Sequence, residues 1–208
     1  MFSWIFVFLS MCMCSSVIVG GLLEIKLIEI FGVQLTAGCF FIPVLYILND
    51  IISEVYGYAK TRKVIFASIF LFITSSLLLN FAALSPSPLE WDGASHFNYI
   101  FGLAPRVAIA GCLATFFGSL SNAKVMSFMK EKLDNLGFKA RAIVSTLVGE
   151  YVDSVVFYCV AFLGIIPFIE LSQMIIIIPI LKIIIEILIL PVTHFIVNKV
   201  KYYESIIK

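Results

Sequence analysis

The sequence predicts an all-α integral membrane protein with six transmembrane helices, a class supported by its composition, its apolar runs and its loop charges. Of 208 residues, 62% are hydrophobic and 13% are charged, whereas a soluble domain has about 45–50% apolar and about 25% charged residues. The mean hydropathy is +1.10. Because so little chain lies outside the apolar runs, residues 1–208 are interpreted as a single transmembrane domain.

Six apolar runs have roughly the 20 residues that a helix needs to cross the hydrocarbon core of a bilayer. They lie near residues 3–23, 36–57, 64–84, 106–126, 142–163 and 174–197. The first run is uncharged and lacks the positive n-region of a signal peptide, so we interpret it as a retained helix. Between the third and fourth runs, turn residues and then aromatic side chains predict a short helix at the membrane surface.

The charges of the connections predict the orientation. Lysine and arginine follow spans two and six and surround the connection between spans four and five, whereas the alternate connections are mainly acidic. By the positive-inside rule, both termini face the cytoplasm. The sequence therefore predicts a multi-pass protein of the cell (inner) membrane.

Span two carries Asn49, Asp50 and Glu54 within an apolar run. The two acids are four residues apart, so they share one face of a helix, where like charges repel. An ionisable residue inside a span is by default a hypothesis for a functional site. A second interpretation pairs Glu54 with the cationic cluster at residues 60–63.

Three further places in the predicted spans carry charge. Span five has Glu150 and Asp153, span six has Lys182 and Glu186, and Arg106 opens span four. Lys182 and Glu186 are four residues apart, which fits a structural ion pair as well as a part of the mechanism. The acids of spans two and five outnumber these cations, so we expect a water-lined cavity. An acidic pair in the second span of each half favours an inverted three-plus-three arrangement with a site between the halves.

The remaining sequence features indicate how the helices pack, argue against an enzyme and suggest the kind of solute. A stripe of small residues in span four ends at Asn122 and is typical of close helix packing. Pro43 and Pro191 lie inside predicted spans and are candidate hinges. The five cysteines form no redox or zinc motif, and no nucleotide-binding loop or hydrolase motif occurs, so we predict neither an enzyme nor a cofactor or metal site. Carboxylates and aromatic rings favour a planar solute that is cationic or guanine-like.

Several motifs occur in a fixed order along nearly the whole chain. They are Asn49-Asp50, Ser53-Glu54-Val55-Tyr56-Gly57, Arg62, Gly102, Pro105-Arg106, Gly118, Asn122, STLVGEYVDS at 145–154, Lys182, Glu186 and Pro191. Together they resemble the queuosine precursor transporter family, also called the vitamin uptake transporter family. The combination of D-x-x-x-E-V-Y-G with a later G-E-x-x-D-S is the most specific part.

The resemblance implies six helices that import a 7-deazaguanine such as preQ0, preQ1 or queuine for tRNA modification. The substrate-binding candidates by motif position are Asn49, Asp50, Glu54, Arg106, Asn122, Glu150, Asp153, Lys182 and Glu186. The partners implied are the deazapurine base and the lipid bilayer, without nucleic acid; a homodimer and an ATPase partner stay open. The alternative is a substrate-binding membrane subunit of an ATP-driven vitamin or nucleobase importer.

Overall fold

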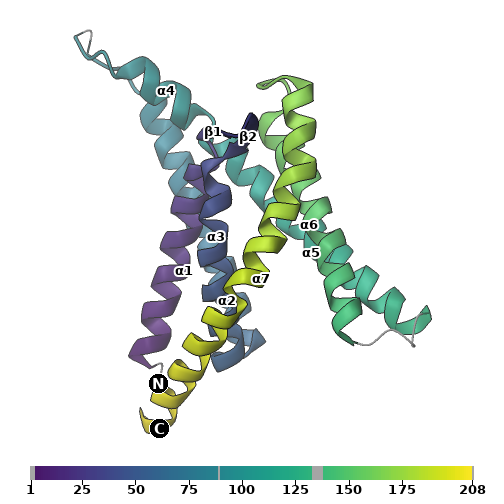
Figure 1. The fold of residues 1–208 in the computed structure, drawn as a ribbon. Helices are drawn as coiled ribbons and strands as arrows, with labels where there is room; N and C mark the ends of the chain where they lie inside the picture. The colour runs from purple at the N-terminus through teal and green to yellow at the C-terminus, as the bar shows by residue number, and fades with distance from the viewer. Residues whose placement is uncertain (1–2, 89, 133–137, 208) are drawn as a thin grey trace. The chain divides into compact units, whose positions relative to one another are not determined.

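The computed structural model describes residues 3–88, 90–132 and 138–207, and it is mainly helical (Figure 1). The helices are α1 (Trp4–Leu23), the 3-10 helix η1 (Ala37–Phe40), α2 (Ile42–Tyr56), α3 (Tyr58–Leu84), α4 (Ala94–Gly102), α5 (Ala104–Lys132), α6 (Phe138–Phe162) and α7 (Phe168–Ile207). Strands β1 (Leu27–Ile30) and β2 (Val33–Thr36) form a two-stranded sheet.

The chain forms two compact units. The first contains α1, η1, α2, α3, α4 and the part of α7 from Ile184 onward. The second contains α5 from Arg106, α6 and the part of α7 up to Ile183. Helix α7 therefore contributes residues to both units.

Five helical segments of the described chain are long and apolar enough to cross a membrane. They are Trp4–Leu23, Ala59–Leu84, Ala94–Gly118, Val144–Phe162 and Phe168–Ile189. The helical membrane class predicted from the sequence is confirmed by this finding. A short helix does lie between spans three and four, because α4 forms there and buries none of its residues. Its position at the membrane surface stays a prediction, since α4 also belongs to the apolar segment Ala94–Gly118.

The second predicted span differs from the expectation. A continuous helix over residues 36–57 is wrong, because β2 ends at Thr36 and a 3-10 turn precedes α2. The 15 residues of α2 extend about 22 Å at 1.5 Å per residue, less than the hydrocarbon core of about 30 Å. Gly57, with φ 84°, ends the helix in a conformation that favours glycine.

Pro43 does not form the hinge that was expected in span two. It stands at the first turn of α2, where the backbone N–H would have no partner within the helix and proline is well tolerated. Pro191 does lie inside a helix, α7, and removes a hydrogen bond to the carbonyl one turn earlier. The hinge interpretation therefore keeps only Pro191.

A hairpin that the sequence analysis did not predict follows α1. Its turn consists of Phe31 and Gly32, which have φ values of 53° and 77°. Positive φ at both central residues matches the twist of the two strands in a tight hairpin. The usual sequence signal, asparagine or aspartate before glycine, is absent from this turn.

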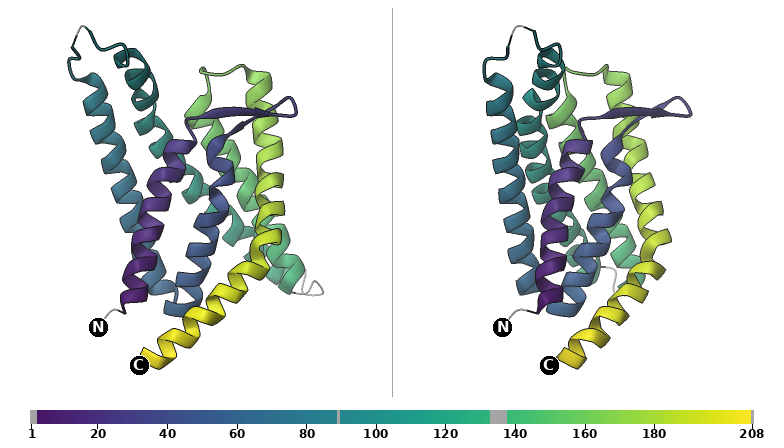
Figure 2. Two further views of the ribbon diagram at one scale, coloured as in Figure 1. Left: turned by 60° about the vertical axis from the view of Figure 1, so that its left-hand side comes forward. Right: turned by 90° about the vertical axis from the view of Figure 1, so that its left-hand side faces the viewer.

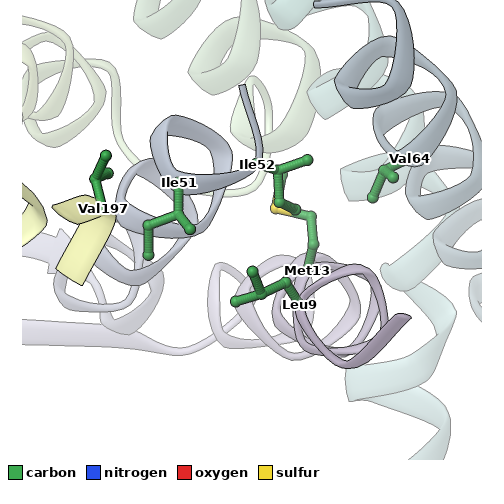
Figure 3. Close-up of a cluster of buried hydrophobic side chains, with 6 residues drawn as sticks. All are labelled: Leu9, Met13, Ile51, Ile52, Val64 and Val197. Carbon is green, nitrogen blue, oxygen red and sulfur yellow. The ribbon is translucent and has the colours of Figure 1, made fainter. Parts of the chain in front are cut away.

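The first unit packs around a buried apolar cluster, which Figure 3 shows. Its members come from α1, α2, α3 and α7: Leu9, Met13, Ile51, Ile52, Val64 and Val197. Helix α1 also lies along α3 in Figures 1 and 2. Gly21 permits this close approach, because a Cβ atom there would be 2.1 Å from Cζ of Phe72. The packing fixes α2 and the C-terminal part of α7, which carry the first group of charges.

Candidate functional site

A groove in the first unit has two acids of α2 on its wall. Its volume is about 610 Å³. The lining residues are Asp50, Ser53, Glu54, Pro191, Thr193, His194, Val197, Asn198 and Lys201. Asp50 and Glu54 come from α2 and the residues from Pro191 onward come from α7, so two helices that are far apart in the sequence form the groove.

Glu54 forms an ion pair with Lys201 across the groove. The two side chains are 61% and 46% exposed, so water can solvate both charges. Two expectations are therefore wrong: Glu54 is not a buried unpaired charge, and this partner comes from α7 rather than from the cationic cluster at residues 60–63. The sequence analysis missed Lys201 because it was counted as a loop residue after span six, whereas α7 continues to Ile207.

Asp50 lies one helical turn before Glu54 and is half-buried. Within the described part of the structure, its carboxylate has no ion-pair or hydrogen-bond partner. The neighbouring Asn49 likewise has a buried Oδ1 atom without a hydrogen-bond partner among the described residues. An unpartnered acceptor in a partly buried place favours a ligand that donates N–H groups.

The C-terminal end of α7 is tied to α1 and α2 beside the groove. Glu204 Oε1 accepts a hydrogen bond from Tyr56 Oη at 2.7 Å and another from Ser3 Oγ. The Tyr56 ring meets the Phe6 ring edge-on with centroids 4.8 Å apart, and Lys60 Nζ lies 5.7 Å from both centroids. These contacts hold the wall of the groove that carries Lys201.

A second charged group lies in the second unit. Lys182 Nζ of α7 is 3.2 Å from an Asp153 oxygen and 3.5 Å from a Glu150 oxygen. The side chains of Lys182, Glu150 and Asp153 are 9%, 17% and 25% exposed. Gly118 of α5 lets α6 approach, because a Cβ atom there would be 2.9 Å from Cβ of Asp153. The small-residue stripe of span four thus packs against the helix that carries these acids.

Two of the predicted site residues have side chains outside the described part of the structure, Asn122 and Glu186. The expected pairing of Lys182 with Glu186 therefore stays a prediction. The partners that the structure does show for Lys182 come from another helix, α6, which spacing along α7 does not reveal.

Arg106 caps the C-terminal end of α6. Its Nε donates to the carbonyl oxygen of Val160 at 2.7 Å, and one terminal nitrogen donates to the carbonyl oxygen of Leu163 at 2.7 Å. The last carbonyls of a helix lack partners within the helix and carry partial negative charge, so an arginine stabilises them. Arg106 thus stabilises the C-terminal end of α6.

The two charged groups have the same composition. Each combines two acids from one helix with one lysine from α7, which leaves one negative charge in the group when both acids are ionised. The sequence analysis expected a larger excess of acid, because it left out Lys201. Ionisable side chains of this kind within apolar helices are typical of helical membrane transporters.

Comparison with known proteins identifies the family. Residues 36–196 match the family model described as "Putative vitamin uptake transporter", and the chain therefore belongs to the vitamin uptake transporter family. A relative from Bacillus subtilis (strain 168), named "Probable queuosine precursor transporter", is 29% identical over 145 residues. The alignment covers 69% of this chain and 63%, less than two thirds, of the relative. No solved structure matches the chain.

The burial of the second charged group predicts a contrast between two lysines of α7. Lys182→Met should lower the free energy of unfolding by up to about 3–5 kcal/mol, because it leaves two largely buried carboxylates without their shared cation. Lys201→Met is the matched control, and its effect should be small because Glu54 remains in contact with water. Denaturant unfolding of the purified protein in detergent measures both. Equal losses of stability in the two variants would contradict the structural role of Lys182.

Proposed function

We propose that this protein is an inner-membrane transporter that imports a queuosine precursor, a 7-deazaguanine such as preQ0, preQ1 or queuine, for tRNA modification. The observation that carries the proposal is the groove in which Asp50 presents a carboxylate without a partner among the described residues. The family of the chain and the printed name of its relative support the substrate class.

The chemistry of Asp50 suits the polar edge of a guanine-like base. That edge presents two parallel N–H donors, and an ionised carboxylate accepts two such hydrogen bonds in one plane. Charge-assisted hydrogen bonds of this kind are stronger than neutral ones, and more so where water is partly excluded. Asp50 therefore binds the base in this proposal, while Ser53 and Glu54 complete the polar wall of the groove on α2. Asn49, next to Asp50 in the sequence, remains a candidate for substrate binding although it does not line the groove.

The remaining candidates take part in substrate binding or gating in this proposal. They are Arg106, Asn122, Glu150, Asp153, Lys182 and Glu186. The proposal includes six spans with both termini in the cytoplasm, and an inverted arrangement of two groups of three spans. The acidic pairs in spans two and five support that arrangement.

Uptake of labelled precursors tests the function. Cells that lack their own precursor transporter should accumulate labelled preQ0, preQ1 or queuine when they produce this chain, and cells with an empty vector should not. Absence of uptake of all three compounds, with the protein present in the membrane, would refute the proposal. Uptake that requires a copurifying ATPase would instead favour the ATP-driven importer.

Asp50→Asn separates a direct contact from a scaffold role. The amide keeps the shape of the side chain but loses the charge, so substrate binding should weaken by roughly 1.5–3 kcal/mol, about ten- to a hundredfold in the dissociation constant. Equilibrium binding of a labelled precursor to the purified protein measures the change. Asp92→Asn, at an exposed residue outside the groove, is the control and should bind normally. Unchanged binding by Asp50→Asn would make Glu150 and Asp153 the leading candidates.

Cysteine labelling tests the six-span topology. In a protein without its five native cysteines, a cysteine at exposed Asp92 should react with an impermeant thiol reagent from outside the cell. Cysteines at exposed Ala59 and Glu131 should react only after the membrane is permeabilised. The reason is that lysine and arginine near the latter two positions keep these connections in the cytoplasm. Labelling of Glu131→Cys in intact cells would overturn the orientation.

A further inference from the structure

The groove holds two carboxylates on one face of α2 that are in different states. Glu54 is occupied by the ammonium group of Lys201, whereas Asp50 has no partner among the described residues. Residues four apart on a helix have Cβ atoms about 5–6 Å apart, so one small molecule can reach both carboxylates. In the groove, the Asp50 carboxylate is therefore available to a ligand, whereas the Glu54 carboxylate is already ion-paired with Lys201.

Lys201 can leave Glu54 at little cost. Both side chains of the pair are about half exposed, and an exposed ion pair changes an equilibrium constant only a few-fold. The lysine stem is flexible, and its ammonium group is strongly hydrated in water. Helix α7 would stay in place, because Val197 packs in the apolar cluster and Tyr56 donates to Glu204.

We propose that Lys201 occupies Glu54 in place of the ammonium group of the substrate, so that the groove selects an amine-bearing 7-deazaguanine over a neutral one. This inference rests on the proposed function. The base binds Asp50 through its N–H edge, and the substrate ammonium replaces that of Lys201 at Glu54. Lys201 then turns toward water, and the substrate ammonium takes its place as the cation beside Glu54.

A neutral precursor gains less from the same groove. The nitrile of preQ0 is a hydrogen-bond acceptor, so it cannot replace an ammonium group at a carboxylate. The aminomethyl group of preQ1 is a cation at neutral pH and makes a charge-assisted bond to Glu54. Charge and donor count therefore favour preQ1, although the two bases share the edge that Asp50 binds.

The experiment compares preQ1 and preQ0 binding to the purified full chain and uses the ratio of their dissociation constants. In the parent protein preQ1 should bind about tenfold more tightly than preQ0, as a charge-assisted bond implies. Glu54→Gln should bring the ratio close to one. Lys201→Met should tighten preQ1 binding by about two- to fivefold, because an exposed ion pair no longer competes, and leave preQ0 binding nearly unchanged.

Lys199→Met is the matched control. Lys199 lies on the same exposed stretch of α7, where its Nζ is 5.3 Å from the centroid of the Phe195 ring, and it does not line the groove. This variant should keep the parent ratio, which separates the position of Lys201 from a general loss of positive charge.

The outcomes distinguish the two proposals. If neither compound binds the parent protein, both the proposed transport of a queuosine precursor and the proposed selection of the amine-bearing base are refuted. If both bind and the ratio is near one, or if Glu54→Gln leaves a large ratio unchanged, the exchange at Glu54 is wrong while the transport proposal stands. Tighter preQ1 binding in Lys201→Met together with a lost ratio in Glu54→Gln supports the exchange.

Discussion

The cost of a charge in apolar surroundings governs the structure. Each acidic pair that the sequence places in an apolar run would be unfavourable without a cation. The structure supplies one lysine to each pair, Lys201 for the pair on α2 and Lys182 for the pair on α6. Both lysines come from α7, whose 40 residues are long enough to contribute to both compact units. Because α7 contributes residues to both units, it can provide one lysine for the acids of α2 and another for the acids of α6.

The two charged groups differ in their exposure to water. Lys182 is almost fully buried and its carboxylates are only 17% and 25% exposed, so removing it leaves charges that water solvates only in part, and exchange with a solute is costly. Lys201 and Glu54 are half exposed and line a groove, so water or a ligand can replace either partner. The same combination of two acids and one lysine is therefore largely closed to water in one unit and open to water and solutes in the other.

The sequence predicted the helices better than it predicted the contacts between them. Apolar runs located α1, α3, α5, α6 and α7 because about 20 apolar residues are rare outside membrane helices. Hydropathy did not reveal the break before α2, since the 3-10 turn, AGCF, is as apolar as a helix. The acids were found because carboxylates stand out in apolar runs. Their lysine partners were missed because spacing along one helix identifies only pairs within that helix, and Lys201 lies beyond the predicted end of span six.

The end of α2 explains why Glu54 needs a cation. Gly57 ends the helix and places Glu54 in its last turn, which contains no basic residue. The C-terminal end of a helix carries partial negative charge, so a carboxylate there is unfavourable and an ammonium group nearby is favourable. Asp50, one turn further from that end, lies beyond most of this field, which falls off within the last turn. The backbone of α2 therefore favours a cation at Glu54 and leaves Asp50 to neutral N–H donors, a division that matches a base with an amine at one end.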